Sequence, residues 1–148
     1  MAKTLVLESQ NFLAQDLSEI RISFQNFIID YIKANLGEID VDSHPEHLAY
    51  DLKEIFGEII GNAVRHGTNA CCVITQTDSR IVVRVSNERE EDTSDMFKEC
   101  GRGLTMIKDY LIDHKDVNIV YLHKETAISY MSILIINKQS LLKSFQKI

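Results

Sequence analysis

Proline and glycine are scarce in this sequence, which has one proline and six glycines among its 148 residues. Disordered tails and flexible linkers are usually rich in these residues, so the composition favours a folded chain. Long hydrophobic runs are also missing. The longest apolar stretches, such as Ile133 to Ile136, are far shorter than the roughly 20 residues of a membrane-spanning helix. We therefore expect neither a membrane protein nor a secreted precursor.

Cysteine and positive charge are limited as well. The three cysteines are Cys71, Cys72 and Cys100, and an odd number with one adjacent pair fits neither a metal-binding knuckle nor a simple disulfide framework. We expect free thiols in a cytoplasmic protein. Sixteen Lys and Arg against 22 Asp and Glu give a net charge of -6, with no basic cluster to offset it. This balance argues against direct binding to nucleic acid.

The chain does have enough apolar residues for one core. It is 45% hydrophobic and 26% charged, and its length is that of a single domain, which we place at residues 1–148. A domain of this size buries roughly 70% of the surface of its unfolded chain, so it needs no structural metal.

Apolar periodicity predicts helices early in the chain. Apolar residues recur at steps of three and four between Leu13 and Gly37, which is typical of an amphipathic helix. The Ser-x-x-Glu arrangement at residues 43–46 resembles a capping box and predicts the start of a second helix. That helix is expected to end at His66 or Gly67, with Gly67 in the left-handed conformation that terminates many helices.

The later part of the chain is mainly β-prone. We expect strands at residues 4–7, 71–77, 81–86, 117–122 and 127–136, further helices at 104–112 and 141–148, and a solvated acidic loop at 88–100. The sum is an α+β fold: a two-layer sandwich of a mixed, mainly antiparallel sheet with helices on one face.

One edge of the second helix carries polar residues at a spacing of four. Glu58, Asn62 and His66 lie on one stripe because an α-helix turns by 100° per residue. An Asn oxygen can bind Mg²⁺, and a Glu can accept a proton from an attacking hydroxyl group. The alternative is that this is the ordinary polar edge of a half-exposed helix.

A second candidate site lies at Gly101-Arg102-Gly103, directly before the next expected helix. Glycines allow consecutive backbone N–H groups to turn toward an anion, and the helix dipole favours negative charge there. The alternative is an ordinary hinge.

Two motifs in this order resemble a known family. Residues 58–67, Glu-Ile-Ile-Gly-Asn-Ala-Val-Arg-His-Gly, resemble the N box of the GHKL (histidine-kinase-like) ATPase superfamily, and Gly101-Arg102-Gly103-Leu104 resembles its Gly-x-Gly-Leu box. The small size and the long preceding helix are similar to those of the anti-sigma-factor serine kinases. Lys124-Glu125-Thr126 stands where that family often has Gly-Thr. The resemblance implies the Bergerat, or histidine-kinase-like, ATPase fold.

The resemblance also implies a function. The chain would bind ATP and Mg²⁺, act as an anti-sigma factor, and phosphorylate a serine of a small antagonist protein. It would form a homodimer and contact partners beside the pocket, near the first helix with its Arg21 and Lys33.

Individual roles follow by position. Glu58 would be the general base and Asn62 the Mg²⁺ ligand, while the other residues would line the nucleotide pocket. These are His66, Gly67, Asn87, Gly101, Arg102, Gly103, Leu104 and Thr126, with Arg102 also placed to contact the γ-phosphate.

The match is imperfect at the next family motif, Asp-x-Gly. Here Asn87 stands for the Asp that accepts the adenine amino group, and Arg89 stands for the Gly. A neutral acceptor in place of a charged one weakens binding by about tenfold. Two further hypotheses therefore stay open: a catalytically impaired domain of this fold that acts as a protein-binding regulatory module, and an unrelated α+β domain with accidental motif matches.

Overall fold

A computed structural model describes residues 3–38, 48–89 and 106–146. Its sheet has five strands in the order β1-β2-β3-β5-β4, and every neighbouring pair is antiparallel. The strands are β1 (Thr4–Ser9), β2 (Gly67–Gln76), β3 (Arg80–Arg89), β4 (Ile119–Glu125) and β5 (Ser129–Asn137).

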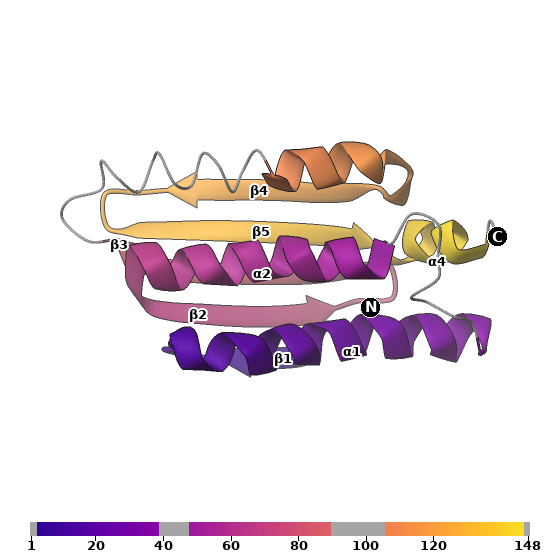
Figure 1. Cartoon of the computed structure of the whole chain (residues 1–148), viewed down its shortest axis with the longest axis horizontal. Coiled ribbons are helices and arrows are strands. Elements are labelled where there is room, and N and C mark those ends of the chain that lie inside the picture. Colours follow the sequence, from indigo (N-terminus) through magenta and orange to yellow (C-terminus); the bar gives the residue numbers. More distant parts are fainter. Residues whose placement is uncertain (1–2, 39–47, 90–105, 147–148) are drawn as a thin grey trace.

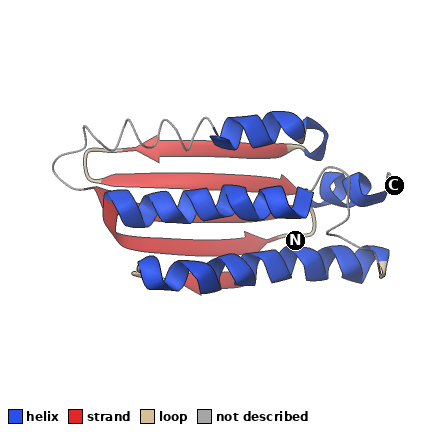
Figure 2. Ribbon diagram, in the orientation of Figure 1, coloured by secondary structure: helices blue, strands red, loops and turns tan. Residues whose placement is uncertain are grey.

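Most of the helices lie over one face of this sheet, and the C-terminal one lies beyond the end of β5 (Figure 1). They are α1 (Leu17–Leu36), α2 (Leu48–His66), the helical residues 106–113 and α4 (Lys138–Gln146), with short 3₁₀ turns η1 (Ala14–Asp16) and η3 (Lys115–Val117). Figure 2 shows the two layers, with α1 and α2 running side by side over the strands. The α+β class is therefore confirmed, and the arrangement is compatible with the expected two-layer sandwich.

The core lies between the two layers, and α2 is at its centre. The apolar face of α2 includes Leu52, Ile55 and Phe56, which are at most 1% exposed. The Phe56 ring stacks on Phe24 of α1 with ring centroids 4.4 Å apart. On the sheet, burial alternates along β3 and β5, so every second side chain faces the helices.

Several predicted details need correction. The expected mixed sheet is wrong, since all its described pairings are antiparallel. The acidic loop begins later than expected because β3 continues through Arg89. Its backbone pairs there with Gly67 of β2, and its N–H donates to the carbonyl oxygen of Ile128, just before β5. The expected capping box at 43–46 and the rest of the acidic loop, 90–100, lie outside the described residues.

The predicted conformation of Gly67 is also wrong. Gly37, at the end of α1, is the glycine of the described chain with a positive φ, 82°. Gly67 instead enters β2 directly after α2. In the described part of the chain, no helix is long and apolar enough to cross a membrane.

Candidate functional site

The polar edge of α2 brings two of the predicted site residues together. Glu58 and Asn62 lie one turn apart on the helix and are both half-buried. Their neighbours Ile59, Ile60 and Ala63 are buried in the core, which fixes the rotation of the helix and keeps this edge at its rim. His66, the last residue of α2, continues the same stripe and is also half-buried.

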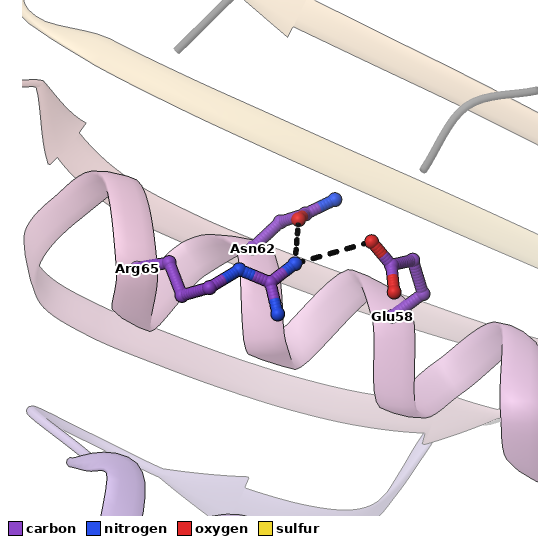
Figure 3. A network of polar contacts seen from close by, with 3 residues as sticks. All are labelled: Glu58, Asn62 and Arg65. Carbon is purple, nitrogen blue, oxygen red and sulfur yellow. Dashed lines mark hydrogen bonds and ion pairs between the residues drawn. The ribbon is translucent and has the colours of Figure 1, made fainter. Parts of the chain in front are cut away.

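Arg65 joins Glu58 to Asn62 (Figure 3). Its Nη2 atom donates to Asn62 Oδ1 at 2.5 Å and lies 3.2 Å from Glu58 Oε1. One cationic nitrogen therefore contacts the carboxylate expected to act as a base and the amide oxygen expected to bind metal. The Arg65 side chain is 52% exposed, so this ion pair contributes little to stability.

A cavity of about 320 Å³ lies beside this network. Glu58 and Arg65 line it from α2, and Arg21 lines it from α1. Met106 lines it from the segment that follows the Gly-x-Gly-Leu residues. Gly101, Arg102, Gly103 and Leu104 themselves lie outside the described residues, but Met106 is only two positions beyond Leu104.

Arg21 is the second cation of the cavity. It forms an ion pair with Glu54 of α2 at 3.1 Å and lies across Gly57. A β-carbon at position 57 would lie 2.8 Å from Arg21 Nε, so glycine allows the guanidinium group to rest on the helix. The cavity wall thus has two guanidinium groups and two carboxylates.

Gly67 and Asn87 meet at the C-terminal end of α2. Asn87 is 3% exposed and lies on the helix-facing side of β3. A β-carbon at position 67 would overlap Asn87 Nδ2 and the carbonyl oxygen of Glu88. Gly67 is therefore required for close approach and not for a left-handed turn. Asn87 Nδ2 donates to the carbonyl oxygen of Glu88 at 3.2 Å.

The Glu58–Arg65–Asn62 network and the Gly67–Asn87 contact lie at separate points along the chain. Gly67 is nine positions after Glu58, which corresponds to about 13.5 Å along an α-helix. A nucleoside triphosphate is elongated, with its base and its terminal phosphate at opposite ends. Asn87, the residue predicted to contact the base, and Glu58, the predicted general base, likewise lie near opposite ends of this stretch.

Thr126 lies in the exposed turn between β4 and β5. Its hydroxyl group accepts from the backbone N–H of Ser129 at 2.9 Å and is 2.8 Å from the Ser129 hydroxyl oxygen. Arg89 donates from Nη1 to the Thr126 carbonyl oxygen at 2.7 Å. The Thr126 side chain is therefore used within its own turn, and Arg89 fastens that turn to the end of β3.

A buried pair attaches the helical residues 106–113 to α2. His114 Nε2 lies 2.5 Å from Asp51 Oδ2, and the two side chains are 2% and 15% exposed. Close by, burial raises the pKa of Tyr110, and the charges of Asp51 and Glu54 add to this effect. This pair fixes the segment that follows the Gly-x-Gly-Leu residues against the helix that carries Glu58.

The site fits a cation, because Glu58 Oε1 and Asn62 Oδ1 already converge on one charged nitrogen. Oxygen ligands of this kind are those that Mg²⁺ prefers. In the described part of the chain there is no group of three or more His, Cys, Asp or Glu side chains placed to hold a metal ion. A metal here would therefore take its remaining ligands from water and substrate oxygens, as Mg²⁺ commonly does.

Comparison with models of known protein families and with curated proteins finds no match. The assignment of the site therefore depends on its own geometry and on the motif resemblance.

The sequence did not indicate the contacts that three arginines make in this region: those of Arg21, Arg65 and Arg89. For Arg65 a signal was present, since it lies three residues after Asn62 and seven after Glu58 on the same helix face. Arg21 and Arg89 contact residues 33 and 37 positions away, and nothing in the local pattern indicates those partners.

Proposed function

We propose that this chain binds Mg²⁺-ATP along the polar edge of α2 and transfers the γ-phosphoryl group to a serine of a small antagonist protein, in the manner of the anti-sigma-factor serine kinases. The observation that carries the proposal is the convergence of Glu58 and Asn62 on one cationic nitrogen beside a cavity that Met106 also lines. Binding of a sigma factor and assembly as a homodimer belong to the same proposal.

The chemistry assigns distinct tasks to the residues of α2. The serine hydroxyl oxygen attacks the γ-phosphorus, and the bond from that phosphorus to the β,γ-bridging oxygen breaks, so ADP leaves. Glu58 accepts the hydroxyl proton as the new bond forms. Asn62 would hold Mg²⁺, which when bound neutralises the charge that develops on the phosphate oxygens.

The other end of the site would hold the base. Asn87 has an amide oxygen that can accept a hydrogen bond from the adenine amino group, while its Nδ2 atom donates to the Glu88 carbonyl oxygen. Gly67 leaves the space in which Asn87 sits. Gly101, Arg102, Gly103 and Leu104 would supply backbone N–H groups to the phosphates, as the resemblance implies.

A second candidate is supported by Arg89. Its side chain, in place of the family's glycine, donates to the Thr126 carbonyl oxygen at the predicted base end of the site. An arginine fixed there reduces the room for a nucleotide. This favours a catalytically impaired domain of the same fold that regulates a partner by binding alone.

Phosphotransfer distinguishes the two candidates. The chain is incubated with Mg²⁺-ATP and candidate small antagonist domains that carry an exposed serine, and phosphoserine is measured by mass spectrometry. The kinase proposal predicts phosphoserine with the wild type and at least a 100-fold slower transfer with Glu58→Ala. Nucleotide binding without phosphoserine would favour the regulatory module.

A further inference from the structure

A guanidinium nitrogen of Arg65 contacts the two oxygens that the proposed metal ion would bind. Its Nη2 atom is 2.5 Å from Asn62 Oδ1 and 3.2 Å from Glu58 Oε1, and all three residues belong to one helix. The guanidinium group is half exposed, and the cavity of about 320 Å³ lies beside it. Arg65 therefore has room to move away from these oxygens while remaining on α2.

We propose that Arg65 is a built-in counter-cation that holds Glu58 and Asn62 in the nucleotide-free protein and must leave Asn62 before a divalent metal binds. The proposal rests on the proposed function, because it takes Asn62 as the metal ligand. A metal ion and a guanidinium nitrogen cannot share one amide oxygen at bonding distance, since two cations that close repel strongly. Arg65 is thus a positioning residue that competes with the metal.

This competition makes nucleotide and metal bind together. Without nucleotide, a metal must displace Arg65 from two acceptors. The displaced guanidinium group then needs another acceptor, and among the described residues the nearby carboxylate Glu54 is already paired with Arg21. A bound triphosphate supplies new oxygens for the displaced guanidinium group, and Arg–phosphate contacts are strong. Metal alone should therefore bind weakly to the wild type, and metal with nucleotide should bind much more tightly.

Electron paramagnetic resonance of free Mn²⁺ measures this directly on the full chain. Without nucleotide, Arg65→Met should bind Mn²⁺ about tenfold more tightly than the wild type, because the competing cation is gone. Arg65→Lys keeps a positive charge and should stay within about threefold of the wild type. Adding Asn62→Ala to Arg65→Met should remove the gain.

Arg80→Met is the matched control, since it removes the same charge from an exposed position at the start of β3 and leaves α2 unchanged. It should not increase Mn²⁺ affinity more than about twofold. Arg65→Gln serves as a second variant if circular dichroism shows that Arg65→Met is misfolded.

Two results would overturn the inference: Mn²⁺ affinity of Arg65→Met equal to that of the wild type, or an equal gain in Arg80→Met. The proposed function fails in a different way, by a lack of Mg²⁺-ATP binding to the wild type. A gain of Mn²⁺ affinity in Arg65→Met can be observed even then, so the two failures are separable.

Discussion

At the scale of single residues, the end of α2 depends on a glycine that is needed for space. Gly67 faces Asn87 so closely that a methyl group at position 67 would overlap its amide and the Glu88 carbonyl oxygen. Asn87 is 3% exposed and the neighbouring Val85 is 2% exposed, so the region has little freedom to adjust. A side chain at position 67 must therefore displace β3 or Asn87.

Gly67→Ala should lower the free energy of unfolding by about 1–3 kcal/mol, which is the usual cost of overpacking. Urea denaturation followed by circular dichroism measures this. The control is Gly61→Ala, within α2, where a β-carbon would be 3.4 Å from the flexible end of Arg65. Helix propensity should make Gly61→Ala neutral or stabilising by up to about 1 kcal/mol. A Gly67→Ala variant as stable as Gly61→Ala would contradict the close approach.

At the scale of elements, the buried His114–Asp51 pair holds residues 106–113 against α2. Removing His114 leaves the Asp51 carboxylate without its hydrogen-bond partner. The desolvation cost of an unpaired buried group exceeds the net stabilisation that the pair contributes. Asp51 lies on the first turn of α2, and the pair is short, at 2.5 Å.

His114→Ala should destabilise the protein by about 1–3 kcal/mol and increase hydrogen exchange in residues 106–113 first. Hydrogen exchange with mass spectrometry reads out both effects. His123→Ala, at an exposed position of β4, should change stability by no more than about 0.5 kcal/mol. The interpretation of His114 is wrong if the two variants behave alike.

The elements themselves were largely predictable from the sequence, and their long-range partners were not. Apolar periodicity predicted α1 and α2, and the β-prone runs predicted the β2–β3 hairpin. The starts of β4 and β5 were predicted too early, at Val117 and Ala127. Val117 lies in η3 and Ala127 lies in the turn before β5, because the apolar residues begin before the paired strand residues do. The use of Gly67 depends on Asn87, 20 positions away, which no local pattern contains.

The candidate site was predictable to the same extent. Glu58 and Asn62 lie on one helix, so their spacing alone places them together. Arg65 lies on that helix too, but a charged residue on an exposed edge is usually solvated, and its two contacts emerge only with side-chain positions. The predicted strands already placed Thr126 between them, but the use of its hydroxyl group within its own turn was not predicted.

In the whole molecule, Glu58 and Asn62 lie at the rim of the helical layer, on the half-buried edge of α2. Buried residues of α1, α2, α4 and the central strands belong to one hydrophobic cluster. Glu58 and Arg65 of α2 line a cavity together with Arg21 of α1 and Met106, and Asn62 lies next to it through its contact with Arg65. The sheet thus acts as a support, and the proposed chemistry takes place along a single helix edge.

Nucleotide binding at α2 is measured by isothermal titration calorimetry with Mg²⁺-ATP. The wild type should bind one nucleotide per chain saturably with a Kd below about 1 mM, and Asn62→Ala should bind at least about tenfold more weakly. Glu58→Ala should retain binding, since Glu58 acts on the serine proton. Mg²⁺-ATP does not bind as proposed if millimolar concentrations give no saturable heat, or if the wild type and Asn62→Ala bind equally.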